Sequence, residues 1–245
     1  MTTETLDINK IGRNVRSNID SATFEYFDKN GDNQLVKIFL KDLTYTGDKI
    51  ITKKLKKISS IEEIRKATDV RKLIYYPDGL LAGYTYGDLR QVSLEKYIYS
   101  SRGKKLEILN NLKKLVKIAK ENNITIGSFD DPDNFAMSEN GIILNDPDNF
   151  EVDDLYFSNP SYYVTSFNKK SENNPNVDAY GFNIFTIMFY SKYTSFNTTL
   201  NGIREEGLPF RFNTSENKEI AKKSLTLSKD YEDKFFIDNM KKTIF

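Results

Sequence analysis

The segment that decides the fold, residues 126–150, reads IGSFDDPDNFAMSENGIILNDPDNF. It holds two acidic stretches that also contain Pro and Asn, at residues 130–134 and 146–149. Two short apolar runs, residues 135–137 and 142–144, lie between them around Glu139-Asn140-Gly141. Asp, Asn, Pro and Gly favour turns, whereas the apolar runs are typical of short strands. The segment therefore predicts two short strands with an acidic loop before and after them.

The clearest helix pattern in the chain precedes this segment. Residues 104–122 carry an apolar stripe at helical spacing, and Asn122-Asn123 ends it. The stripe consists of Leu106, Leu109, Leu112, Leu115, Val116 and Ala119. A long amphipathic helix is therefore expected immediately before the acidic loops, and residues 93–99 predict a shorter one.

The first part of the chain reads mainly as strands. Residues 22–27 and 34–40 predict a hairpin, and residues 71–76 and 80–86 predict a second one around Pro77-Asp78-Gly79. Between the hairpins, Asp48 is expected to begin a helix. Its apolar face would carry Ile50, Ile51, Leu55 and Ile58, and its opposite, solvated face would carry Lys53, Lys54, Lys56 and Lys57.

The remainder of the chain reads mostly as helices. Asp178 begins an apolar helix that extends through Phe189, and residues 218–245 predict two amphipathic helices. Strands, a helix, short strands and then helices predict an α+β fold with two lobes. We expect an N-terminal β-sheet lobe with one helix at residues 1–86 and a mainly helical C-terminal lobe at residues 87–245.

The composition excludes several kinds of chemistry. The 245 residues include no Cys and no His, which removes disulfides, thiolate nucleophiles, Ser-His-Asp triads and the usual zinc sites. Any reaction must rest on Asp, Glu, Lys, Asn and hydroxyl groups, with or without a hard metal ion. The net charge of +1 favours neither nucleic acid nor an anionic membrane as a partner.

The location is predicted from what the sequence lacks. Residues 1–10 do not have a signal-peptide pattern, and the longest apolar stretch is about half of the ~20 residues that a membrane span needs. A cytoplasmic protein is the expectation. The abundance of Asn, Lys, Ile and Tyr suggests an AT-rich bacterial or phage genome, and for a phage protein the host cytoplasm or the virion is the expected place.

The ordered set of these elements resembles the protein-kinase fold. Val36-Lys37-Ile38 resembles the strand whose Lys pairs with the ATP phosphates, and residues 80–89 resemble the strand and hinge that hold adenine. Residues 126–135 are similar to the catalytic loop. Residues 144–150 resemble the metal-binding Asp-Phe-Gly segment in an Asp-x-Asp-x-Phe form found in some bacterial kinase-like proteins. Asp178-Ala179-Tyr180-Gly181-Phe182 resembles the opening of the kinase F helix.

The resemblance implies a set of site residues, with ATP and Mg²⁺ as the expected cofactors. Lys37, Gly12, Tyr84 and Tyr86 would bind the nucleotide. Asn134, Asp146 and Asp148 would bind Mg²⁺, which prefers hard oxygen ligands. Asp178 would anchor the backbone of the catalytic loop. Without the resemblance, the acidic loops could be plain turns or a calcium site, although neither matches the EF-hand pattern, and Asp178 could be a helix N-cap.

The sequence also departs from the kinase pattern. Ile126-Gly127-Ser128 stands where His-Arg-Asp is expected. If Asn134 is the metal-binding Asn, the catalytic base falls at Phe129; if Asp133 takes that place, it falls at Ser128. The helix expected to pair a Glu with Lys37 contains no Glu, and the phosphate-binding segment at residues 11–22 contains a single Gly.

Two functions therefore stay open. The first is a pseudokinase, a binding or structural module that joins a protein partner or a larger assembly and has residual or no nucleotide binding. The second is an atypical Ser/Thr-kinase-like phosphotransferase that uses Asp130 or Asp131 as its base. The several departures together favour the first.

Overall fold

The computed structural model divides the chain into two compact units, Met1–Gln91 and Val92–Phe245. The sequence-based prediction puts the boundary after Tyr86. The structure describes residues 1–17, 20–28, 33–40, 45–87, 92–127, 129, 132–153, 155, 177–190, 198–199, 201–202, 205, 214–223, 225 and 235–239.

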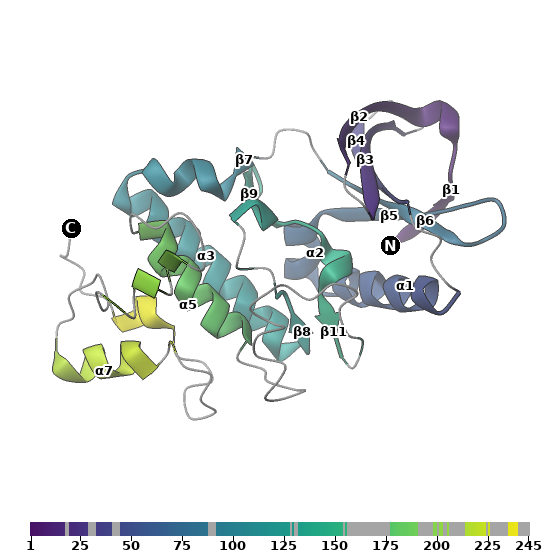
Figure 1. The fold of residues 1–245 in the computed structure, drawn as a ribbon. Helices are drawn as coiled ribbons and strands as arrows, with labels where there is room; N and C mark the ends of the chain where they lie inside the picture. The colour runs from purple at the N-terminus through teal and green to yellow at the C-terminus, as the bar shows by residue number, and fades with distance from the viewer. Residues whose placement is uncertain are drawn as a thin grey trace. The chain divides into compact units, whose positions relative to one another are not determined.

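Unit 1 contains a six-stranded sheet in the order β1-β5-β6-β4-β3-β2 (Figure 1). Its strands are β1 (Thr2–Thr5), β2 (Ile11–Ser17), β3 (Ser21–Phe27), β4 (Asn33–Phe39), β5 (Val70–Tyr75) and β6 (Leu81–Tyr86). Both predicted hairpins are confirmed, because β3 pairs antiparallel with β4 and β5 pairs antiparallel with β6. The strand β1 was not predicted. It pairs parallel with β5, and its Thr-Glu-Thr sequence lacks the apolar alternation that marks a strand.

Two helices follow β4 in unit 1. The first, α1 (Tyr45–Ser60), has Ile51, Leu55 and Ile58 on its buried face, and the second is α2 (Glu62–Thr68). The helix α1 begins before the expected cap at Asp48. Instead of capping, the Asp48 carboxylate accepts a hydrogen bond of 3.0 Å from the backbone N–H of Leu81 in β6. A buried side chain of α1 is thereby fixed to the sheet.

The predicted solvent face of α1 is wrong at one position. Lys53 and Lys56 are exposed, but the side chain of Lys54 is only 1% exposed. The physical reason is the helical spacing itself. Residue 54 lies three residues after Ile51 and four before Ile58, which places it at the flank of the apolar stripe rather than opposite to it.

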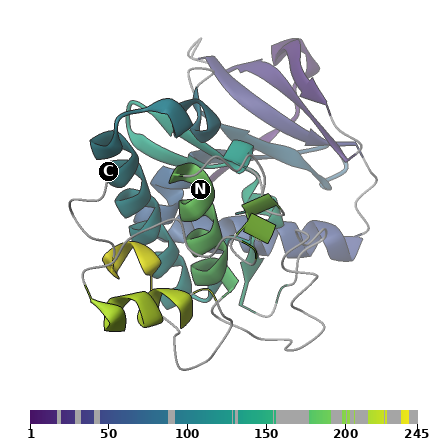
Figure 2. The same cartoon turned by 60° about the vertical axis from the view of Figure 1, so that its left-hand side comes forward.

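Unit 2 is built around two helices that lie side by side, α3 (Arg102–Glu121) and α5 (Val177–Tyr190) (Figure 2). Ser101 caps α3 by accepting a hydrogen bond from the backbone N–H of Lys104. Ile108, Leu109, Leu112, Val116 and Ala119 are the buried residues of α3, whereas Leu106 of the predicted stripe is partly exposed. In α5, residues 177–189 are all buried, so this helix forms the centre of the unit 2 core.

The fold-deciding segment forms a hairpin in unit 2. Its strands are β9 (Phe135–Ser138) and β10 (Gly141–Leu144), and β10 packs against α3. The short strand β7 (Val92–Ser93) pairs with β9, and β8 (Ile124–Thr125) pairs with β11 (Glu151–Val152). Three 3₁₀ helices complete this region: η2 (Leu94–Tyr99), η3 (Pro132–Asn134) and η4 (Pro147–Asn149). The predicted short helix at residues 93–99 is therefore the 3₁₀ helix η2.

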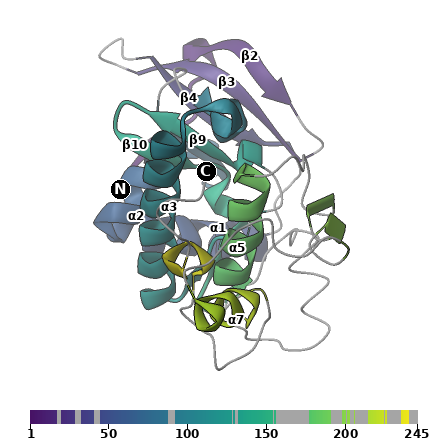
Figure 3. The same ribbon diagram turned by 90° about the vertical axis from the view of Figure 1, so that its left-hand side faces the viewer.

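The two helices predicted for residues 218–245 are found only in part. The described residues show α7 (Ser215–Lys223) and a four-residue 3₁₀ helix, η6 (Phe236–Asn239); apart from Leu225 and Phe235, the rest of the range lies outside them. Figure 3 shows α7 together with α3 and α5. The segment that contains η6 is fixed to α5, because the side-chain oxygen of Asn183 accepts a hydrogen bond of 2.9 Å from the backbone N–H of Phe236.

None of the described helices is both long enough and apolar enough to cross a bilayer. The most apolar helix, α5, has 14 residues and is buried in unit 2.

Candidate functional site

Lys37 is a buried lysine in the middle of the unit 1 sheet. It lies in β4, opposite Thr23 of β3 on one side and Tyr84 of β6 on the other. Its side chain is only 5% exposed, and its Nζ lies 6.0 Å from the centre of the Tyr84 ring. That distance is typical of a cation–π contact. The sheet therefore holds an ammonium group against an aromatic face.

Tyr84 and Tyr86 form an aromatic wall beside Lys37. Their ring centres are 5.8 Å apart, since residues i and i+2 of a strand share one face of the sheet. The hydroxyl of Tyr86 is 3.4 Å from the hydroxyl of Thr23. Three of the four residues predicted to bind the nucleotide are therefore neighbours on one face of this sheet.

The fourth residue, Gly12, lies in the strand β2. A Cβ atom at Gly12 would be 3.0 Å from Cε2 of Phe27 and 3.1 Å from Cβ of Glu25. This crowding gives Gly12 a packing role between β2 and β3. Its predicted contact with phosphate stays a prediction, and residues 18–19, which connect these strands, lie outside the described residues.

The β9–β10 hairpin joins the two acidic loops of unit 2. The backbone N–H of Asn145 donates to the carbonyl of Asn134 at 2.9 Å, and its side-chain amide donates to the carbonyl of Asp133 at 2.9 Å. Asn134 and Asp146 are thus held at the same end of one hairpin. Asp133, the alternative to Asn134, accepts a hydrogen bond of 2.6 Å from the hydroxyl of Ser93.

Asp146 and Asp148 share the short turn η4. Asp146 has a left-handed backbone with φ of 52°, and its carbonyl accepts a hydrogen bond from the N–H of Asn149. The side chain of Asp148 is 7% exposed. With Asn134, these residues offer the oxygen atoms that Mg²⁺ prefers. However, in the described part of the chain no three Asp, Glu, His or Cys side chains gather in a way that could hold a metal ion.

Asp178 holds the start of the catalytic-loop-like segment. Its side chain, 4% exposed in the first turn of α5, accepts hydrogen bonds from the backbone N–H groups of Ile126 at 2.6 Å and Gly127 at 2.8 Å. Burial raises the pKa of Asp178 to about 7, although the two backbone hydrogen bonds oppose the shift. A helix N-cap and an anchor of the catalytic loop would both lie at the start of α5. The two hydrogen bonds come from Ile126 and Gly127, outside α5, which is the arrangement expected of a loop anchor.

Phe129 occupies one of the two positions at which the base was expected. It is 0% exposed and packs against three other rings of unit 2. Its ring centre lies 4.9 Å from that of Phe135, 6.3 Å from Phe182 and 6.2 Å from Phe185. A carboxylate at this position would lie in an aromatic core. The other position, Ser128, and the proposed bases Asp130 and Asp131 lie outside the described residues.

Comparison with solved structures identifies the fold. A structure described as an apo pseudokinase aligns over 96% of this chain and 93% of its own chain, with a TM-score of 0.60 and 8% sequence identity. No protein-family profile and no curated protein sequence matches the chain. The chain therefore has a protein-kinase-like fold, as the order of motifs predicted. At this identity the similarity concerns the fold alone.

One charged residue of unit 1 was not predicted as part of a site. Lys54 is buried in α1, the helix that was expected to supply a Glu to Lys37. The signal that could have found it was its spacing from Ile51 and Ile58, which places it beside the apolar stripe. Four lysines within five residues suggested a solvated face and hid that spacing.

Proposed function

We propose that this chain is a pseudokinase, a kinase-like module that binds a ligand or a protein partner and does not transfer phosphate. The observation that carries the proposal is Phe129. It stands five residues before Asn134, where a base would be required, and is packed among three aromatic rings. A general base must reach the proton that it removes and must be able to accept it. A buried phenyl ring does neither.

The second possible register leads to the same function. Asp178 holds the N–H groups of Ile126 and Gly127, which supports counting these two residues as the first two of the segment that replaces His-Arg-Asp. The next residue is Ser128. A serine hydroxyl is not an effective base at neutral pH, because it carries no negative charge to accept the proton. Both registers therefore lack a carboxylate at the required position.

The nucleotide and metal residues fit a residual binding role. Lys37 is a point charge suited to phosphate, and Asn134, Asp146 and Asp148 are suited to Mg²⁺. Mg²⁺, when bound, would neutralise phosphate charge. With two carboxylates and one amide as candidate ligands, we propose that metal binding is weak and that the main activity of the module is assembly with a protein partner.

Mass spectrometry after incubation with ATP and Mg²⁺ or Mn²⁺ tests the proposal. We expect no phosphate on the chain or on generic protein substrates. Phosphate incorporation that disappears in both Lys37→Ala and Asp146→Ala would support the alternative, a phosphotransferase that uses Asp130 or Asp131. Asp130→Asn and Asp131→Asn, tested separately, would then identify the base.

A further inference from the structure

Glu25 of β3 is an acid that contacts the segment around Gly12. Its carboxylate accepts a hydrogen bond from the backbone N–H of Arg13 at 3.4 Å and another from the Arg13 guanidinium at 3.1 Å. A Cβ atom at Gly12 would lie 3.1 Å from Cβ of Glu25 and 3.3 Å from its Oε2. Gly12 is the single Gly of residues 11–22, the segment that the kinase resemblance assigns to phosphate. A negative charge of the chain itself therefore lies against this segment.

Phe27 covers Gly12 from the same side as Glu25. Its Cε2 would be 3.0 Å from a Cβ atom at Gly12. Glu25 and Phe27 are two residues apart in β3, so their side chains share one face of the sheet. A Gly lets an anion approach the backbone closely because it has no side chain. Here the carboxylate and the ring already occupy that approach on the side where the Cβ atom would point.

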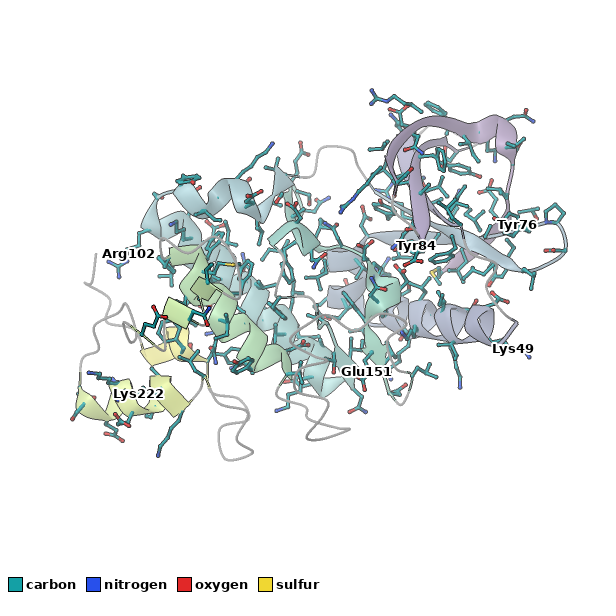
Figure 4. All side chains as sticks on the ribbon, viewed as in Figure 1. Lys49, Tyr76, Tyr84, Arg102, Glu151 and Lys222 are labelled. Atoms are coloured by element: carbon teal, nitrogen blue, oxygen red, sulfur yellow. The ribbon has the colours of Figure 1, made fainter. Side chains whose placement is uncertain are left out.

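The same face of the sheet carries the residues predicted to bind a nucleotide. Thr23 is two residues before Glu25 in β3 and pairs directly with Lys37 of β4, which in turn pairs with Tyr84 of β6. Directly paired residues of antiparallel strands share a face. Two printed contacts agree: Lys37 lies over the Tyr84 ring, which Figure 4 labels, and the hydroxyls of Thr23 and Tyr86 are 3.4 Å apart. Glu25 therefore lies on the candidate nucleotide face.

The ion pair of Glu25 engages donors that suit a phosphate. Backbone N–H groups and guanidinium groups are the usual partners of phosphate oxygens. In this chain the N–H of Arg13 and one nitrogen of its guanidinium donate to the Glu25 carboxylate instead. The side chain of Glu25 is 19% exposed, whereas that of Arg13 is 75% exposed. A phosphate that approached Gly12 would thus meet a carboxylate of like charge, and like charges facing each other disfavour binding.

We propose that Glu25 is an internal anion that keeps the phosphate groups of a nucleotide away from the segment around Gly12. The inference rests on the proposed function and deepens it, because it names a residue that limits nucleotide binding by this module. Removal of the charge would release Arg13, whose planar guanidinium can bind two phosphate oxygens at once. Since the repulsion acts on phosphate, it weakens binding of a nucleoside triphosphate and leaves binding of an uncharged nucleoside unchanged.

Glu25→Gln tests the proposal, because Gln keeps the shape of Glu and removes its charge. Isothermal calorimetry measures the affinity of the unmodified chain and of the variant for ATP with Mg²⁺ and for adenosine. We expect Glu25→Gln to bind ATP about tenfold more tightly or better, and to bind adenosine as the unmodified chain does. Equal ATP affinities, or no ATP binding by Glu25→Gln, would overturn the inference. An equal gain for adenosine would do the same, because it would show that the phosphates are not involved.

Two further variants test where the effect arises. Glu63→Gln removes the same charge from an exposed position in α2 and should leave the ATP affinity unchanged. An equal gain in this control would assign the effect to net charge and refute the role of Glu25. The double variant of Glu25→Gln with Arg13→Met should lose most of the gain, because the released guanidinium is then missing. An undiminished gain would refute the inference that Glu25 withholds Arg13 from phosphate.

The two proposals fail in different ways. Phosphate incorporation from ATP by the unmodified chain would refute the pseudokinase function. Equal ATP affinities of the unmodified chain and Glu25→Gln would refute the internal anion and leave the pseudokinase function standing. Far-ultraviolet circular dichroism of each variant checks that a changed affinity does not reflect a changed fold.

Discussion

Asp178 is a buried acid in unit 2. Burial raises its pKa from 3.8 to about 7, and the negative charge of Glu151 adds to the shift. Between pH 3.8 and about pH 7, the folded state therefore retains a proton on Asp178 that the unfolded chain has already lost. Stability falls with pH wherever the folded state binds more protons than the unfolded state. The contribution of Asp178 to the free energy of unfolding is thus largest below pH 3.8, falls up to about pH 7 and is constant above.

Asp178→Asn tests the predicted direction of this pH dependence of stability. The variant loses one of two hydrogen bonds to Ile126 and Gly127, so it should be less stable at acidic pH, by about 1–3 kcal/mol. The difference from the unmodified chain should shrink as the pH rises towards 7, because Asn carries no charge to bury. Urea denaturation across this range measures both slopes. A difference that grows with pH would mean that the carboxylate is stabilised in its charged form.

Gly83 makes possible the close approach of two central strands. A Cβ atom there would lie 1.8 Å from the carbonyl oxygen of Lys37, which is backbone and cannot rotate away. Gly83→Ala should therefore destabilise unit 1 by about 3 kcal/mol or more and move Lys37 from its position over Tyr84.

Gly103 gives a matched control for this substitution. It lies in the first turn of α3, and a Cβ atom there meets nothing within 4 Å. Gly103→Ala should stabilise the chain by about 0.5–1 kcal/mol, because Ala is the better helix former. Thermal denaturation of both variants gives the comparison. Equal effects would show that the strands around Gly83 can move apart at little cost.

The strand β1 is an element whose stability depends on one side chain. Glu4 accepts from Lys10, from Lys72 at 3.1 Å and from the hydroxyl of Tyr26 at 3.3 Å. Burial raises the pKa of Glu4, but the bonds from Lys10 and Lys72 outweigh it, and the net pKa is lowered. The charged carboxylate is therefore the form that fixes β1 to the sheet.

Removal of residues 1–5 should lower the free energy of unfolding by about 2–4 kcal/mol, since β5 loses a hydrogen-bonded neighbour and Lys10 and Lys72 lose their shared acid. Hydrogen exchange should become faster in β5 and stay unchanged in α5, which belongs to the other unit. Glu4→Gln separates the two effects, because it keeps the strand and removes the charge. If the deletion and Glu4→Gln destabilise equally, the strand pairing itself contributes nothing.

Long elements with a clear sequence signal were the ones that the sequence predicted well. The stripe of α3 follows directly from burial of one face, whereas β3 to β6 were recognised as runs rich in β-branched and aromatic residues, with turn residues between the paired strands. The strand β1 and the short helix α2 escaped prediction, because a polar edge strand and a seven-residue helix give too few repeats to show a period. Lys54 escaped for a different reason: a run of lysines suggests a solvated face, and this run hid the spacing of Lys54 from Ile51 and Ile58.

The sequence proposed which residues form the candidate site, but it did not fix the register of the loop or the burial of its side chains. Sequence order selected Lys37, Asp146 and Asp178 as candidates, and the roles of Lys37 and Asp146 stay predictions. It could not decide between Phe129 and Ser128 as the base position, since a shift of one residue in a loop leaves no periodic trace. The burial of Phe129 and the two hydrogen bonds to Asp178 are tertiary properties that become visible only in the folded chain.

At the scale of the whole molecule, the departures from the kinase pattern are spread over both units. Unit 1 has Lys54 on the helix expected to carry a Glu and a single Gly in its phosphate-binding segment. Unit 2 has Phe129 or Ser128 in place of the base. Loss of a general base costs about 10²–10⁴-fold in rate, and a misplaced group on the order of 10²-fold. If the proposed function is correct, several such losses together would leave little activity for any single substitution to restore.

Ser128→Asp tests the proposal that several departures, and not one alone, prevent phosphate transfer. The substitution returns a carboxylate to the position that follows Ile126 and Gly127, but it leaves the phosphate-binding segment and Lys54 unchanged. Phosphate transfer should therefore stay well below the ~1–100 s⁻¹ of active kinases. A coupled assay of ADP release, with Ser128→Ala as the control, measures it. If Ser128→Asp alone reaches the rate of an active kinase, the remaining machinery is intact, and the chain is an enzyme that lacks one carboxylate rather than a module adapted to binding.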